Sequence, residues 1–195
     1  MNYLIKKIIK KNIFLEKNDL EKKMMKVGYI YDDITANYLL GDVHEKNIQE
    51  LLRKYIFNKI KLGTSIDIGA HIGFWARDFV KNCSKLHCFE PHPINFECLQ
   101  KNLNVKVADN DADVVLYNCA LGEEEQPVYM HFVEHNTGET HVGEELKDTF
   151  YNGKFIDAKA NATMYSLDSF NLSPDFIKID VEHYEMKVLR GAKET

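Results

Sequence analysis

The sequence predicts an α/β fold in which helices flank a mostly parallel sheet. Two observations support this fold class. From residue 65 onward, short apolar runs alternate with segments of helical periodicity, which is the pattern of βαβ units. The 195 residues are 45% hydrophobic and 28% charged, a composition typical of one globular domain and unlike that of disordered or collagen-like chains. Nowhere do about 18 consecutive apolar residues occur, so no membrane-spanning segment is expected.

The predicted elements follow one another in the order that such a sheet requires. Four strands of the main sheet are expected at residues 65–68, 86–90, 113–119 and 176–181. Apolar side chains recur at helical spacing in four segments, so helices are expected at residues 44–59, 74–82, 94–103 and 184–191. A polar stretch rich in His and Glu follows Gly122, with candidate strands at residues 128–133 and 162–167.

Residues 1–42 are expected to form a basic arm outside the main domain, which is placed at residues 43–195. Residues 1–26 hold eight Lys against three acidic residues, a net charge of +5. Residues 3–26 have the pattern of an amphipathic helix, and residues 27–40 that of a short strand or hairpin. The helix suits the surface of an anionic membrane, but the favoured interpretation is that its apolar stripe packs on the main domain.

Charge and cysteine content argue against several classes of function. Beyond residue 26 the net charge is −10, because the whole chain carries −5, and this argues against a binder of nucleic acids. The four Cys form no C-x-x-C pair, so free thiols in a reducing compartment are expected rather than a zinc site or a redox motif. Lys6 and Lys7 interrupt the N-terminal apolar run, so no signal peptide is predicted and the cytoplasm is the expected location.

The residues that follow the first two strands indicate a nucleotide-derived cofactor. In a parallel sheet, ligands bind beyond the carboxyl ends of the strands, where the strand order reverses. The first strand ends in Asp67 and a glycine-bearing turn; Glu90 ends the second, 21 residues after Gly69, where an acid accepts both hydroxyls of a ribose. A dinucleotide fingerprint would need Gly at two positions that hold His71 and Phe74. The pattern therefore favours S-adenosylmethionine, which has no pyrophosphate, over NAD.

Five ordered sequence blocks lie at or near the predicted strand ends. They are D-I-G-A-H-I-G at residues 67–73, F-E-P at 89–91, N-C-A-L-G at 118–122, S-L-D-S at 166–169 and I-K-I-D-V-E-H-Y-E at 177–185. Together they resemble the FkbM family of S-adenosylmethionine-dependent methyltransferases, from about residue 45 to the C-terminus. The resemblance implies a Rossmann-like class I methyltransferase fold and methyl transfer, usually to a hydroxyl oxygen, with a glycan or a small metabolite as the acceptor.

The resemblance also implies roles for individual residues. Those that would bind the cofactor are Asp67, Gly69, Ala70, Gly73, Glu90, Asn118 and Ala120. The first four would line its methionine and ribose portions, Glu90 would hold the ribose hydroxyls, and the last two would lie near the adenine. A hydroxyl acceptor needs a general base. The candidate catalytic residues follow the last strand and are Asp180, Glu182 and His183.

Two histidines depart from the family pattern. His71 replaces the usual Asn of the first block, and His183 replaces the usual Gly of D-V-E-G. An ordinary imidazole pKa near 6.5 suits a general base at neutral pH, which is one reading of His183. The other, a surface His at the start of a helix, is favoured.

The chain ends where a sheet of this kind is expected to continue. The strand at residues 176–181 would then form an apolar edge of the sheet, which promotes aggregation unless it is covered. We therefore expect either that the chain is a fragment, with the C-terminal strands of the fold missing, or that a partner chain covers this edge in an oligomer.

Other functions are weighed against methyl transfer. A methyltransferase acting on nucleic-acid bases would carry a Pro-Pro-aromatic or Pro-Cys motif after the last strand, whereas Val181 and Glu182 follow Asp180. A catalytically silent or incomplete nucleotide-binding module is the alternative that stays open. No metal site is expected, because His131 and His135 would lie about 13 Å apart on a strand and two carboxylates supply too few ligands.

Overall fold

The computed structural model describes residues 45–104, 112–131, 141–143, 150–151, 154–155 and 161–195. The predicted helix at residues 3–26, the predicted strand or hairpin at 27–40 and the boundary at residue 42 lie outside this part of the chain. So does His135, one of the two histidines weighed as metal ligands.

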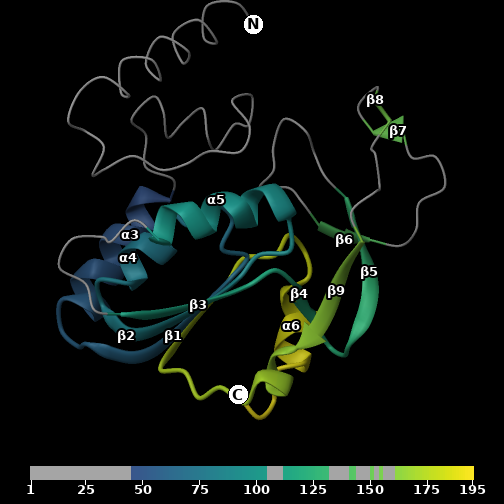
Figure 1. Ribbon diagram of the computed structural model, residues 1–195. Coiled ribbons are helices and arrows are strands. Elements are labelled where there is room, and N and C mark those ends of the chain that lie inside the picture. The colour runs from purple at the N-terminus through teal and green to yellow at the C-terminus, as the bar shows by residue number, and fades with distance from the viewer. Residues whose placement is uncertain (1–44, 105–111, 132–140, 144–149, 152–153, 156–160) are drawn as a thin grey trace, which may run out of the picture.

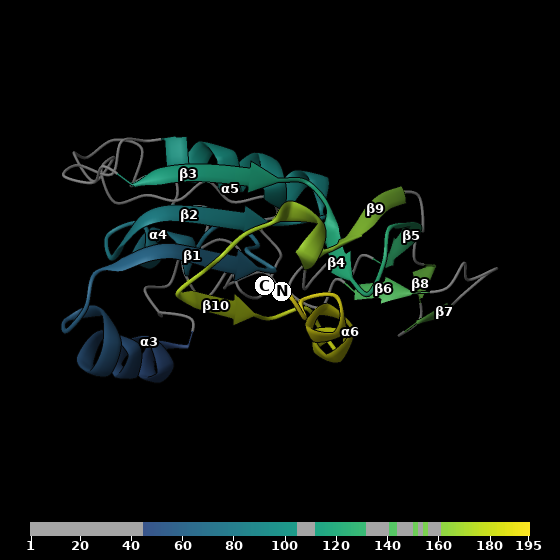
Figure 2. The ribbon, with the colours of Figure 1, turned by 90° about the horizontal axis from the view of Figure 1, so that it is seen from below.

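The main sheet has four parallel strands, which confirms the predicted α/β fold (Figures 1 and 2). Its strands are β1 (Leu62–Ile68), β2 (Cys83–Phe89), β3 (Asp113–Tyr117) and β10 (Phe176–Ile179). The order across the sheet is β10-β1-β2-β3. The strand order therefore reverses between β1 and β10, which is where open α/β sheets bind ligands.

Helices cover one face of this sheet. They are α3 (Lys46–Leu52), which continues as the π-helical turn η2 (Arg53–Phe57), α4 (Ala76–Phe79) and α5 (Pro93–Asn104). Predicted to span residues 74–82, α4 is much shorter, because residues 80–82 form a turn that leads into β2 at Cys83. At the start of α5, the His92 Nδ1 atom accepts hydrogen bonds from the backbone N–H groups of Ile94 and Asn95.

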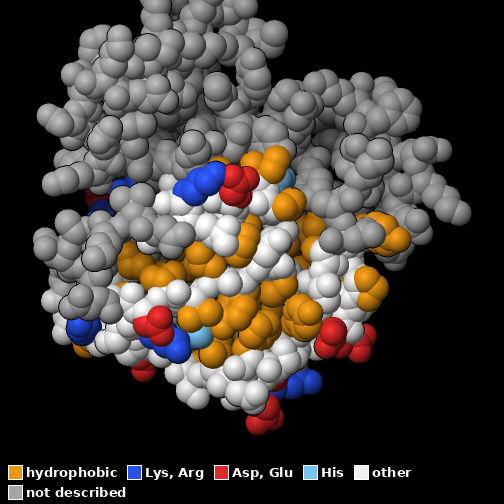
Figure 3. All heavy atoms as spheres, in the orientation of Figure 1, with side chains coloured by type: hydrophobic (Ala, Val, Ile, Leu, Met, Phe, Trp, Pro, Cys, Tyr) orange, Lys and Arg blue, Asp and Glu red, His pale blue; other side chains and the backbone are white. Residues whose placement is uncertain are grey.

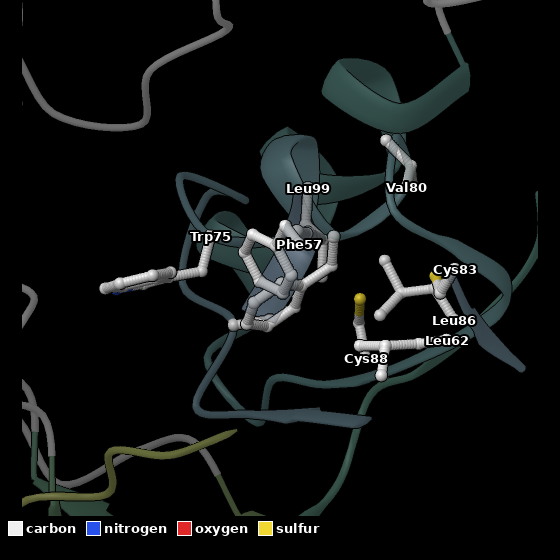
Figure 4. Packing of buried hydrophobic residues seen from close by; sticks show 11 residues of the cluster. Phe57, Leu62, Trp75, Val80, Cys83, Leu86, Cys88 and Leu99 are labelled. Carbon is white, nitrogen blue, oxygen red and sulfur yellow. The ribbon is translucent and has the colours of Figure 1, made fainter. Parts of the chain in front are cut away.

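An apolar core lies on each face of the main sheet. The core under the helices includes Phe79, whose ring centroid lies 5.7 Å from that of Phe57, together with the side chains that Figure 4 labels. The second core lies on the other face, where Ile66, Ile68 and Phe89 pack against the 3-10 helix η4 (Leu167–Phe170) and the helix α6 (Glu185–Arg190). All four cysteines are buried free thiols, as expected.

A second sheet lies beyond the edge at which the main strands end (Figure 2). Its strands, in order, are β4 (Ala120–Gly122), β9 (Asn161–Ser166), β5 (Gln126–His131) and β6 (His141–Gly143). A separate hairpin joins β7 (Phe150–Tyr151) to β8 (Lys154–Phe155). The predicted strands at residues 128–133 and 162–167 correspond to β5 and β9. No strand was predicted at the position of β4.

Both outer strands of the described main sheet are partly exposed. The residues of β10 are all of intermediate burial, and most of those of β3 are as well. On the face seen in Figure 3, hydrophobic side chains gather below α5, and charged side chains lie toward the rim. Within the described ranges, no helix is long and apolar enough to cross a membrane.

Candidate functional site

The ends of three neighbouring strands bring the predicted site residues together. Ile68, the last residue of β1, pairs with Phe89 at the end of β2 and with Ile179 at the end of β10. The next residues along the chain are Gly69, Glu90 and Asp180. The predicted cofactor-binding residues of β1 and β2 therefore lie at the same edge as the predicted catalytic residues after β10.

The turn after β1 has a backbone shape that excludes side chains at one position. Gly69 has a φ of 75°, and its N–H group and that of Ala70 both donate to the Phe89 carbonyl at 3.0 Å. A Cβ atom on Gly69 would lie only 1.9 Å from the Asp180 carbonyl oxygen. This contact requires glycine and places the turn directly against the start of the segment after β10.

Glu90 links the turn after β1 to the loop after β2. Its Oε2 atom accepts a hydrogen bond from the His71 N–H at 2.7 Å, and its Oε1 atom accepts one from the His92 N–H at 2.8 Å. The side chain is only 5% exposed. Burial raises the pKa of Glu90 to about 7, although the two N–H donors act in the opposite direction.

Asn118 and Ala120 lie at the end of β3 and in β4. The exposed Asn118 side chain donates from Nδ2 to the Glu90 carbonyl at 2.8 Å and to the Pro91 carbonyl at 3.1 Å. Asn118 thereby fixes the backbone on both sides of the Glu90–Pro91 peptide bond. Ala120 is buried in an apolar cluster with Val128, Met130 and Met164 of the second sheet.

Asp67 lies beneath the site. Its side chain has no exposed surface, and its Oδ1 atom lies 3.3 Å from the Lys178 Nζ atom. Burial raises the pKa of Asp67, and the attraction of Lys178 counteracts that rise. Burial acts to lower the pKa of Lys178, but the attraction of Asp67 and Asp180 outweighs it, so the pKa lies above its usual value and the ammonium group keeps its charge.

The candidate catalytic residues follow β10 on a segment with an unusual backbone. The Asp180 side chain is 48% exposed, and its Oδ2 atom lies 3.3 Å from the Lys178 Nζ atom. Glu182 and His183 have φ angles of 45° and 68°, in the left-handed region that favours glycine. This conformation gives a physical reason for Gly in place of His183 in the family pattern. His183 is exposed and Glu182 is partly exposed.

Sequence reasoning missed Lys178 as a member of this site. A signal was present, because a Lys between Ile177 and Ile179 in an apolar strand requires an anionic partner once it is buried. That partner, Asp67, is its neighbour across the β1–β10 pair. In the residues that the structure describes, no group of three His, Cys, Asp or Glu side chains is arranged to hold a metal ion.

Two comparisons with known proteins found a similar family and a similar fold. The family model of the methyltransferase FkbM domain matches residues 67–195, which include the whole site. No curated protein matches the chain. Among solved structures, the methyltransferase FkbM from Methylobacillus flagellatus KT matches with a TM-score of 0.50 at 16% sequence identity. The match covers 96% of this chain but 46% of that protein, so the chain spans about half its length, and the similarity shows the fold.

Proposed function

This chain belongs to the FkbM family of methyltransferases, and on that basis we propose that it transfers a methyl group from S-adenosylmethionine to a hydroxyl oxygen. The acceptor that we propose is a glycan or a small metabolite, and the proposed location is the cytoplasm. Methyl transfer by direct displacement needs the acceptor oxygen in line with the methyl group and about 3 Å from it. The task of the protein is therefore mainly to position two reactants.

The state of Glu90 is the observation that carries this proposal. A buried carboxylate with a pKa of about 7 is poorly compensated in its charged form. Each of its oxygens already accepts one backbone hydrogen bond, and a carboxylate oxygen can accept a second. The two hydroxyls of a ribose would supply these additional hydrogen bonds. The residues present thus fit the nucleoside part of S-adenosylmethionine.

The remaining site residues divide between the two reactants. The turn that begins at Gly69 would help to form the cofactor site, since its His71 N–H already donates to the Glu90 carboxylate. The bound cofactor supplies an activated methyl group on a sulfonium ion. Asp180, Glu182 and His183 are the candidates to accept the proton from the acceptor hydroxyl. The second sheet lies beyond the same edge of the main sheet, which supports a role for it in holding the acceptor (Figure 2).

Thermal melting of the full chain with S-adenosylhomocysteine, the demethylated product, tests cofactor binding. At about 100 times its Kd, the ligand should add about 2.7 kcal/mol of stability, which raises Tm by a few degrees in a domain of this size. NAD should leave Tm unchanged. Glu90→Gln should abolish the shift, and Glu97→Gln, which changes an exposed acid on α5, should retain it. A chain that melts cooperatively but responds to neither ligand would contradict the proposal.

Turnover separates an active enzyme from a catalytically silent module. The full chain would be incubated with methyl-labelled S-adenosylmethionine and pools of hydroxylated glycans and small metabolites. We expect label in an ether linkage, and a loss of about 10²-fold or more in rate when the true base among Asp180, Glu182 and His183 is replaced. Binding of S-adenosylhomocysteine without label transfer to any pool would favour the silent module instead.

A further inference from the structure

Lys178 makes three polar contacts at the edge where β1 and β10 end. Its Nζ atom lies 3.3 Å from Asp67 Oδ1 and 3.3 Å from Asp180 Oδ2, and it donates a hydrogen bond to the Gly69 carbonyl at 3.1 Å. The side chain is only 14% exposed. One ammonium group therefore touches the last part of β1, the turn after it and the first residue after β10.

Neutralising Asp67 accounts for only one of these contacts. A buried ammonium group is costly to desolvate, and an anion opposite to it in the sheet offsets that cost. The other two contacts reach the groups on which the proposed chemistry depends. Gly69 begins the turn after β1, which we propose to be part of the cofactor site. Asp180 is a candidate base, and its backbone carbonyl lies against Gly69. The Asp180 N–H also donates to the Ile68 carbonyl at 3.0 Å, so the backbones of both segments are joined beside Lys178.

We propose that Lys178 is a positioning residue, whose ammonium group holds the Gly69 carbonyl and the Asp180 carboxylate in one fixed arrangement. This inference rests on the proposed function, because it assigns the two segments to the two reactants. Without the ammonium group, the turn loses the hydrogen bond to its first carbonyl, and the Asp180 side chain loses its tether. The cofactor would then bind to a turn that has first to be ordered, which weakens binding.

Variants of Lys178 made in the D67N chain separate this role from simple neutralisation of the Asp67 charge. Lys178→Met alone leaves Asp67 buried without a cation and is expected to destabilise the fold strongly. Asp67→Asn removes that anion, so the double variant D67N/K178M buries no unpaired charge and is compared with D67N as its reference. D67N/K178R restores a cation at the same position. Lys85→Met is the matched control, since Lys85 is a partly exposed strand lysine paired with Asp113 at 3.5 Å, away from the site.

Two measurements are made on each variant of the full chain. Isothermal titration gives the affinity for S-adenosylhomocysteine, and hydrogen exchange gives the protection of residues 67–73. Relative to D67N, we expect D67N/K178M to bind at least about tenfold more weakly and to exchange faster in that segment. D67N/K178R should recover part of both losses, and K85M should match the wild-type chain.

The two measurements together can overturn the inference. If D67N/K178M melts cooperatively and equals D67N in both affinity and exchange, Lys178 serves only to neutralise Asp67. If the wild-type chain binds no S-adenosylhomocysteine, the proposed function fails. The exchange of residues 67–73 then decides the role of Lys178 by itself, because unchanged protection in D67N/K178M would show that the ammonium group does not hold the turn.

Discussion

S-adenosylhomocysteine should bind this protein about ten times more tightly at pH 8 than at pH 6, because Glu90 must be ionised to accept both ribose hydroxyls. In the free protein, burial raises the pKa of Glu90 to about 7. A protonated carboxyl donates one hydrogen bond of its own and so loses one of the acceptor positions that the two hydroxyls need. Binding therefore selects the ionised form.

The size of the effect follows from the ionised fraction. With a pKa of about 7, roughly one tenth of Glu90 is ionised at pH 6 and roughly nine tenths at pH 8. Apparent affinity scales with the fraction of protein in the competent state, so the ratio between the two pH values is about ten, or about 1.4 kcal/mol. The ligand itself keeps the same charges over this range.

The raised pKa also has a consequence for stability in the absence of ligand. Between pH 4.5 and 7 the folded chain holds a proton on Glu90 that the unfolded chain has released, so stability decreases as the pH rises. The whole decrease is about 3 kcal/mol, because the pKa moves from 4.5 to about 7 and each unit corresponds to about 1.4 kcal/mol.

Titration calorimetry and urea unfolding at several pH values between 5 and 8 would measure both effects. Glu90→Gln cannot titrate and offers only one acceptor oxygen, so its affinity should be low and independent of pH. The difference in stability between the wild type and this variant isolates the contribution of Glu90 from that of every other titratable group. The reasoning is refuted if wild-type affinity is constant from pH 6 to 8, or if the variant keeps the wild-type slope.

Three further predictions concern the turn, the core and the cysteines. Gly69→Ala should cost about 2 kcal/mol or more in urea unfolding and abolish ligand binding, since its Cβ would lie 1.9 Å from the Asp180 carbonyl oxygen; wild-type behaviour would contradict the close approach. Phe79→Ala should cost about 3–5 kcal/mol, because the side chain is 1% exposed and lies between Phe57 and Phe176; a cost below 1 kcal/mol would argue against this packing. The native chain should react slowly with a thiol reagent at all four cysteines, where burial raises the pKa of Cys119 to about 12, and rapidly after denaturation; one fast native thiol would disagree.

The sequence predicted the main sheet well because its strands are apolar, and the two central strands, β1 and β2, are mostly buried. Strands of a parallel sheet are typically short apolar runs in the sequence, and each of the four predicted runs corresponds to a parallel strand at nearly the expected place. The ends of the strands could also be predicted, because glycine and acidic residues directly follow the apolar runs. The predicted length of α4 was wrong, since apolar periodicity over residues 74–82 does not reveal that the chain already turns after Phe79 toward β2.

The second sheet could be predicted only in part from the sequence. Its β4 strand has three residues, too few for a periodic pattern, and its pairing with β9 joins segments about 40 residues apart. Position 183 shows another limit of sequence reading. The change from Gly to His was visible, but the left-handed backbone that makes it costly became visible only in the structure.

By itself, the sequence determined the fold class, the cofactor class that its spacing favours and the residues at three strand ends, because these depend on short-range patterns. The tertiary structure decided how those residues interact. It buried Asp67 entirely, gave Glu90 two backbone donors from different loops and set Lys178 between β1 and β10. Burial and charge pairing across strands depend on register between distant segments, and one-dimensional spacing carries no measure of that register.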